Sequence, residues 1–111
     1  MAFVRTCMLD IDYILKPLKK DLKEALGEKL SEVILFGSYS RGDYSQYSDI
    51  DLLILVETDP GKEETQMVDD LVASYSLKYD MVISGIVYPA EIYRRFNTPF
   101  LQNVKEEGIA I

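Results

Sequence analysis

Two aspartates, Asp49 and Asp51, open the most aliphatic stretch of the chain, DIDLLILVE (49–57). In an extended strand, residues two apart project from the same face, so the two carboxylates converge while Ile50 and Leu52 turn into the core. Adjacent carboxylates repel each other, and a divalent cation between them removes that penalty. The spacing therefore predicts a magnesium site, although an isolated pair of this kind is often only a solvated strand end.

A third acidic residue, Asp80, begins the apolar run DMVISGIVY (80–88), which is typical of a strand. If this strand lies beside the first at about 4.8 Å, Asp80 joins the pair at one sheet end. Three carboxylates could hold two Mg²⁺ ions, one aligning an acceptor hydroxyl and one neutralising a triphosphate. Asp80 is then the candidate general base, and the alternative is a plain carboxylate at a strand start.

The run SEVILFG (31–37) is typical of a buried strand that stops at a glycine. Without a Cβ, Gly37 lets a phosphate approach the backbone, and free N–H groups at the following turn favour anions. The Ser38 hydroxyl and the Arg41 guanidinium could then bind a triphosphate. The alternatives are that Ser38 is a helix N-cap and that Arg41 forms a structural ion pair.

The polar segment 37–48, GSYSRGDYSQYS, predicts a tight turn or one helical turn followed by an exposed loop. It is not a P-loop, because Gly42 is followed by Asp43 and not by Lys, and its glycine spacing is not the dinucleotide-binding one. The loop tyrosines could stack on a nucleobase or meet a partner, and exposed tyrosines often do neither. These tyrosines are Tyr39, Tyr44 and Tyr47.

The flanking segments predict the elements that would position these residues. Apolar residues recur at three- and four-residue steps over 10–26, which is typical of an amphipathic helix ending at Gly27, with Pro17 marking a kink or the start of its regular part. Asp59 is expected to cap a helix that starts at Pro60, runs to about Tyr79 and buries Met67, Leu71, Val72, Tyr75 and Leu77. Further helices are expected from Pro89 and from a Thr98 cap with Pro99 first. We expect one α/β (α+β) domain over 1–111, with three or four strands and about four helices.

Composition excludes several functions. The 12 basic and 19 acidic residues give a formal charge of −7, which disfavours stable binding of nucleic acid and favours a basic partner. The chain contains no histidine, so imidazole-based hydrolase triads are excluded and zinc chemistry is disfavoured. A single cysteine, Cys7, and the absence of a long apolar run predict a cytoplasmic chain with no membrane association.

The run LFGSYSRGDYSQYSDIDLLI (35–54) resembles the signature of the DNA polymerase beta-like nucleotidyltransferase superfamily: Gly-Ser, ten intervening residues, then Asp-x-Asp. The short chain and its tail FNTPFLQNVKEEGIAI are similar to minimal nucleotidyltransferases, often encoded beside HEPN-domain ribonucleases as antitoxins. The resemblance implies a mixed sheet flanked by helices, Gly37 and Ser38 on the triphosphate, and Asp49 and Asp51 on magnesium. By position it also implies that Asp80 is the third carboxylate.

The leading hypothesis is magnesium-dependent transfer of a nucleoside monophosphate, AMP from ATP, to a hydroxyl of a partner protein such as a tyrosine of a HEPN-type toxin. One alternative is an antitoxin that masks a basic partner without turnover. Another is transfer to a small molecule such as an antibiotic, in a cleft completed by a homodimer.

Overall fold

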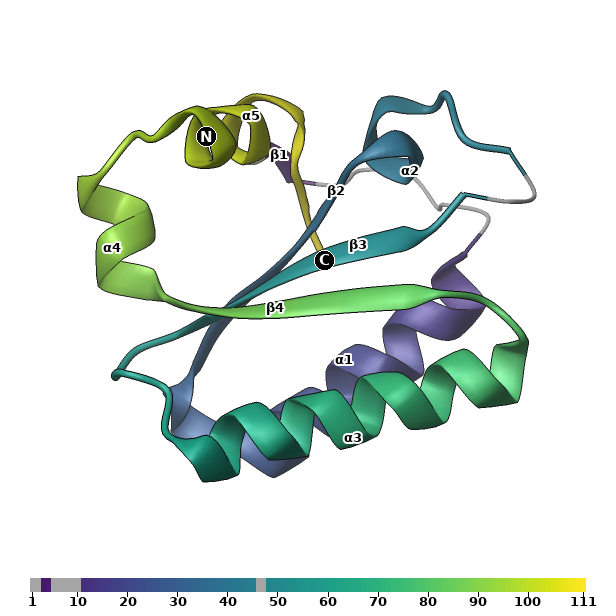
Figure 1. Ribbon diagram of the computed structural model, residues 1–111, viewed down its shortest axis with the longest axis horizontal. Helices are drawn as coiled ribbons and strands as arrows, with labels where there is room; N and C mark the ends of the chain where they lie inside the picture. Colours follow the sequence, from purple (N-terminus) through teal and green to yellow (C-terminus); the bar gives the residue numbers. More distant parts are fainter. Residues whose placement is uncertain (1–2, 5–10, 46–47) are drawn as a thin grey trace.

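The computed structural model describes residues 3–4, 11–45 and 48–111. Within these ranges one sheet carries helices on both faces (Figure 1). In chain order the elements are β1 (Phe3–Val4), α1 (Asp12–Leu26), the 3₁₀ helix η1 (Gly27–Lys29), β2 (Leu30–Phe36), α2 (Ser38–Arg41), β3 (Ile50–Val56), α3 (Lys62–Tyr79), β4 (Ile83–Pro89), α4 (Ala90–Arg95), α5 (Pro99–Glu107) and β5 (Ile109–Ala110).

The strand order is β1-β5-β2-β3-β4. β2 pairs antiparallel with β3 and with β5, whereas β3 pairs parallel with β4, so the sheet is mixed as predicted. The three long strands correspond to the three apolar runs of the sequence. The two-residue strands β1 and β5 were not predicted, because two residues are too few to produce an alternating pattern.

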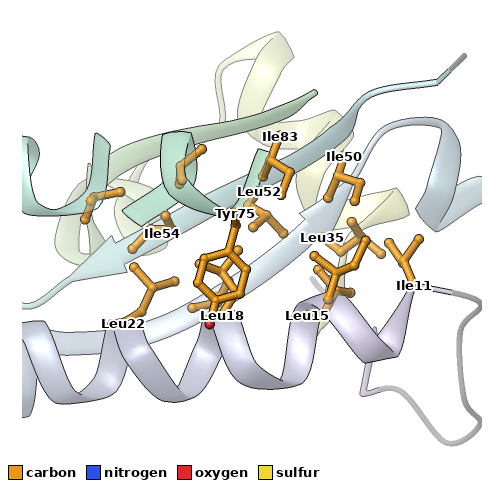
Figure 2. Close-up of a cluster of buried hydrophobic side chains, with 14 of the residues drawn as sticks. Ile11, Leu15, Leu18, Leu22, Leu35, Ile50, Leu52, Ile54, Tyr75 and Ile83 are labelled. Atoms are coloured by element: carbon orange, nitrogen blue, oxygen red, sulfur yellow. The ribbon is translucent and has the colours of Figure 1, made fainter. Parts of the chain in front are cut away.

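One face of the sheet is covered by α1 and α3, which lie side by side in Figure 1. Figure 2 shows the apolar stripe of α1 pointing at the sheet, with Leu18 and Leu22 against the strand residues Leu52 and Ile54. All four side chains are at most 1% exposed. Burying one such side chain stabilises the fold by about 1.5–3 kcal/mol, so this layer fixes the position of β3.

The other face is covered by α4 and α5. Ile34 of β2 and Leu53 of β3 pack there against Leu101 and Val104 of α5. β3 is therefore buried on both faces, which confirms the prediction of a central strand. Thr98 caps α5 as predicted, because its Oγ1 accepts a hydrogen bond from the amide of Leu101 at 3.3 Å.

The helix α3 begins two residues later than the sequence predicted. Asp59 is not its cap and Pro60 is not its first residue, because Gly61 is the N-cap and the helix starts at Lys62. The reason is a local bond: the Gly61 amide donates to Oε2 of Glu64 at 3.1 Å.

The predicted buried face of α3 is also corrected. Val72 and Tyr75 are buried as predicted, and Leu71 is half-buried. Met67 is 37% exposed and Leu77 is 85% exposed, whereas Val68 faces the core. Moving one residue along a helix rotates the side chain by about 100°, so a shift of one position from Met67 to Val68 is enough to change the buried stripe.

Pro17 is the sixth residue of α1, so the helix begins five residues before the proline and does not start at it. Pro17 cannot donate to the carbonyl of Tyr13, whose side chain is 60% exposed. The predicted start at Asp10, and also Cys7, lie outside the described residues. None of the described helices combines the length and apolarity needed to span a bilayer.

Candidate functional site

The turn after β2 brings the backbone of Gly37 against the carboxylate of Asp51. Gly37 has φ 81° and ψ −157°, a conformation that is essentially confined to glycine. A Cβ atom at this position would collide with Oδ2 of Asp51 and would lie 3.3 Å from its Cγ. The glycine turn therefore faces the acidic pair and leaves no room for a side chain between them.

Asp49 and Asp51 lie on either side of Ile50, which is fully buried. Asp49 immediately precedes β3 and is exposed, whereas Asp51 is half-buried within the strand. The pKa of Asp51 is raised, first by burial and second by the negative charge of Asp49, and the charge of Arg41 opposes this shift. The two carboxylates are thus close enough for the charge of one to be felt at the other.

The strand register identifies a neighbour that the sequence did not single out. Ser84 of β4 lies directly across from Asp51, and Phe36 of β2 lies on its other side. Ser84 is exposed, and its hydroxyl can donate a hydrogen bond to a carboxylate or a phosphate. It escaped the sequence analysis because only the observed start of β4 fixes which residue stands opposite Asp51.

Ser38 is the first residue of α2, and the N-cap position belongs to Gly37. The alternative that Ser38 is a helix N-cap is therefore wrong. The amides of Ser40 and Arg41 donate to the Gly37 carbonyl at 3.1 and 3.2 Å. The amide of Ser38 comes earlier, at the first position of the helix, where the backbone offers no carbonyl four residues before it within the helix.

Arg41 is held by two carboxylates. Its Nε donates to Oδ2 of Asp43 and its Nη1 to Oε2 of Glu107, both at 3.1 Å. These hydrogen bonds raise the pKa of the Arg41 guanidinium. The structural ion pair considered for Arg41 is confirmed, and its contact with phosphate stays a prediction.

Asp80 does not stand at the start of a strand. It is the C-cap of α3 in the left-handed conformation, with φ 52° and ψ 47°, and its amide donates to the carbonyl of Ser76. Because α3 continues to Tyr79, β4 begins only at Ile83, three residues later than predicted. Throughout the described ranges no group of three or more acidic, cysteine or histidine side chains could hold a metal ion, so the predicted grouping of Asp80 with the pair is absent there.

The loop tyrosines differ from one another. Tyr39 is only 7% exposed, and its ring stacks on that of Tyr44 with centroids 4.4 Å apart and planes at 15°. Tyr44 is 38% exposed, and Tyr47 lies outside the described residues. Tyr39 is thus buried against the core, which makes it a poor candidate for stacking on a nucleobase.

The sequence profile of the nucleotidyltransferase domain matches residues 15–111. The chain belongs to this nucleotidyltransferase family. A curated protein of Methanocaldococcus jannaschii, named as a candidate protein adenylyltransferase, is 44% identical over 103 residues, which make up 93% of this chain and 100% of that protein. The prediction of a minimal nucleotidyltransferase is therefore confirmed.

Solved structures share the fold. A toxin–antitoxin complex with AMP-PNP matches with a TM-score of 0.61 and 24% identity, over 92% of this chain and 72% of that one. A rebuilt structure of the tri-AMPylated Shewanella oneidensis HEPN toxin with its MNT antitoxin matches with a TM-score of 0.60 and 21% identity, over 89% and 69%. The predicted mixed sheet with flanking helices is thus the nucleotidyltransferase fold.

In this nucleotidyltransferase the acidic pair fits a divalent cation. The pKa of Asp51 is raised by its burial and by Asp49, which means that the bare pair disfavours full ionisation. A hard cation bound to one oxygen of each carboxylate would favour the ionised form of both. Mg²⁺ commonly takes one or two protein carboxylates and completes its shell with phosphate oxygens and water, so a third carboxylate is not required.

Proposed function

We propose that this chain is a magnesium-dependent adenylyltransferase that transfers AMP from ATP to a hydroxyl group of a partner protein. The observation that carries the proposal is the contact of the Gly37 turn with the Asp51 carboxylate. It brings the backbone that we propose to bind phosphate close to a carboxylate that we propose to bind the cation. Family membership supports nucleotidyl transfer as the reaction class.

The residues of the turn would bind the triphosphate. Gly37 gives phosphate access to the backbone, and the amide and hydroxyl of Ser38 can donate to the phosphate oxygens. Arg41 supplies positive charge at the end of the same helical turn. Asp49 and Asp51 would hold Mg²⁺, which when bound neutralises the triphosphate and activates the attacking hydroxyl.

The transfer itself needs an in-line displacement at the α-phosphorus. The acceptor oxygen bonds to that phosphorus while the bond to the bridging oxygen breaks and pyrophosphate leaves. The hydroxyl proton passes to a carboxylate oxygen of the Asp49–Asp51 pair. Catalysis then rests on positioning and charge stabilisation, which is what a rigid central strand beside a glycine turn provides.

The acceptor is proposed to be a HEPN-type protein. The support is the fold shared with the MNT antitoxin that is bound to a tri-AMPylated HEPN toxin, together with the adenylyltransferase name of the 44% identical relative. The formal charge of −7 favours a partner whose docking surface is basic.

The test is transfer of label from α-phosphate-labelled ATP, with Mg²⁺, to a HEPN-type protein from the same genome. The wild-type chain should label that protein, and replacing Mg²⁺ with a chelator should stop the reaction. Asp49→Asn with Asp51→Asn should abolish labelling without unfolding the chain, because Asp49 is exposed, Asp51 is only half-buried, and asparagine has nearly the same shape as aspartate. Label transfer that persists in the double variant would exclude this mechanism.

The acidic charge also favours a second candidate, inhibition of a basic partner by binding alone. The same double variant separates the two. If it forms the complex and blocks the partner as well as the wild-type chain does, without ATP, inhibition is by masking. If it binds the partner but leaves it active, inhibition requires transfer.

A further inference from the structure

The guanidinium of Arg41 is held from two directions. Asp43, two residues along the chain, accepts from Nε, and Glu107, at the last position of α5, accepts from Nη1. Glu107 lies 66 residues away in the sequence, so its contact depends on the docking of α5. Two carboxylates on two different nitrogens fix the plane of the guanidinium as well as its place, because its donors form a rigid fork.

The held guanidinium lies beside the turn proposed to bind the triphosphate. Arg41 and Ser38 are three residues apart on one helical turn, so their side chains share a side of α2. The positive charge of Arg41 is felt at Asp51, where it opposes the rise in the pKa of that carboxyl. Within the described residues these two bonds use Nε and Nη1, so Nη2 can donate to a phosphate oxygen.

An exposed arginine gives up much of its rotamer freedom when it binds a ligand. The two ion pairs of Arg41 restrict its guanidinium before a ligand binds, which would reduce that loss. We propose that Glu107 is a positioning residue that presets Arg41 for the triphosphate, so that the end of α5 contributes to nucleotide affinity. This inference rests on the proposed function, and it gives α5 a role beyond covering the sheet.

Loss of the Glu107 charge could also strengthen ATP binding, for a simple electrostatic reason. Glu107 carries a negative charge near a proposed triphosphate site, and removing that charge alone should tighten nucleotide binding. Glu107→Gln keeps the shape of the side chain and removes its charge. The two ideas therefore predict changes of opposite sign in the dissociation constant for ATP.

The experiment is calorimetric titration of the chain with ATP and Mg²⁺. Glu107→Gln should raise the dissociation constant at least about threefold, the effect of releasing a side chain rich in rotamers. Glu106→Gln is the matched control, because it removes the same charge from the adjacent position of α5. Glu106 is exposed, and among the described residues its hydrogen bond is to Gln102. The dissociation constant of this variant should be equal to or lower than that of the wild type.

The effect must also pass through Arg41. In an Arg41→Gln background, Glu107→Gln should leave the dissociation constant for ATP unchanged or lower it, because only the negative charge of Glu107 is then removed. A weakening of the same size in that background, or ATP binding by Glu107→Gln that is as tight as the control, overturns the positioning role.

A measurement without nucleotide separates this inference from the proposed function. The NMR signal of the Arg41 Nη1 hydrogens, which donate to Glu107, should be protected from exchange in the wild type and lose protection in Glu107→Gln. A signal unaltered by the substitution overturns the inference even if ATP binds, whereas a wild-type chain that shows the protected signal but binds no ATP contradicts the proposed function.

Discussion

The carboxylate of Asp51 is the most closely surrounded acidic group of the site. The Gly37 backbone approaches it from β2, the charge of Asp49 acts on it along β3, and Ser84 lies across from it on β4. A carboxylate in such a position is held in one place before any ligand arrives. Preorganisation of this kind lowers the cost of binding a cation and a triphosphate.

The Gly37 position tests that close approach. Gly37→Ala should destabilise the fold by on the order of 1–3 kcal/mol, because the backbone there is strained for any residue with a Cβ. It should also lower AMP transfer by about 100-fold, because the added carbon displaces Asp51. Urea unfolding and labelled transfer measure the two effects separately.

Gly42→Ala is the matched control for this substitution. Gly42 also has a positive φ, of 84°, but a Cβ there meets nothing within 4 Å. The strain should cost about 1 kcal/mol and leave most of the transfer activity. Equal losses of activity in the two variants would mean that strain, and not the contact with Asp51, explains the result.

Asp80 is expected to act as a helix cap. Asp80→Asn should change stability by less than about 0.5 kcal/mol and transfer by less than about twofold, because asparagine tolerates the left-handed conformation as well as aspartate does. Transfer rates and urea midpoints of the variant measure this. A tenfold loss of transfer at unchanged stability would support the original prediction that Asp80 takes part in catalysis.

At the scale of elements, a partly buried polar contact joins α1 and α3. The Tyr75 hydroxyl of α3 donates to Oδ2 of Asp21 on α1 at 2.5 Å. Burial and then this hydrogen bond raise the pKa of Tyr75 to about 12. Because the folded pKa lies above the usual value near 10, the contribution to stability is complete below pH 10 and is lost as the pH rises towards 12.

This shift predicts a measurable dependence on pH. Between pH 9 and pH 11 the free energy of unfolding of the wild type should fall by on the order of 1 kcal/mol more than that of Tyr75→Phe. Urea titrations at the two pH values give the comparison. Parallel declines in the two proteins would show that Tyr75 titrates alike in the folded and unfolded chains.

The sequence predicted elements well where local patterns decide them. The leucines of α1 recur at helical steps, and the run 49–57 is too aliphatic for anything but a central strand. The boundary between α3 and β4 could not be predicted, because Asp80 ends the helix in a left-handed conformation that few residues other than glycine adopt.

The same distinction holds for the candidate site. Gly37, Ser38, Asp49 and Asp51 follow a spacing that can be read locally. The bond between Arg41 and Glu107 joins residues 66 apart, and the position of Ser84 depends on register, so neither leaves a signal in the sequence.

At the scale of the whole molecule, the two helical layers have different roles. The layer of α1 and α3 packs the larger apolar cluster and holds the sheet rigid. The other layer does not cover the start of β3, where Asp49 is exposed. From this layer, Glu107 of α5 forms an ion pair with Arg41 of α2. The proposed chemistry is therefore located where a rigid sheet edge, a short helical turn and the last helix meet.

The most direct measurement is a crystal structure of the chain with Mn²⁺ and a non-hydrolysable ATP analogue, with anomalous scattering used to place the metal. The proposed function predicts metal within about 2.1–2.3 Å of carboxylate oxygens of both Asp49 and Asp51, and analogue phosphates against Gly37 and Ser38. Metal and phosphates bound elsewhere, with the acidic pair left unliganded, would contradict it.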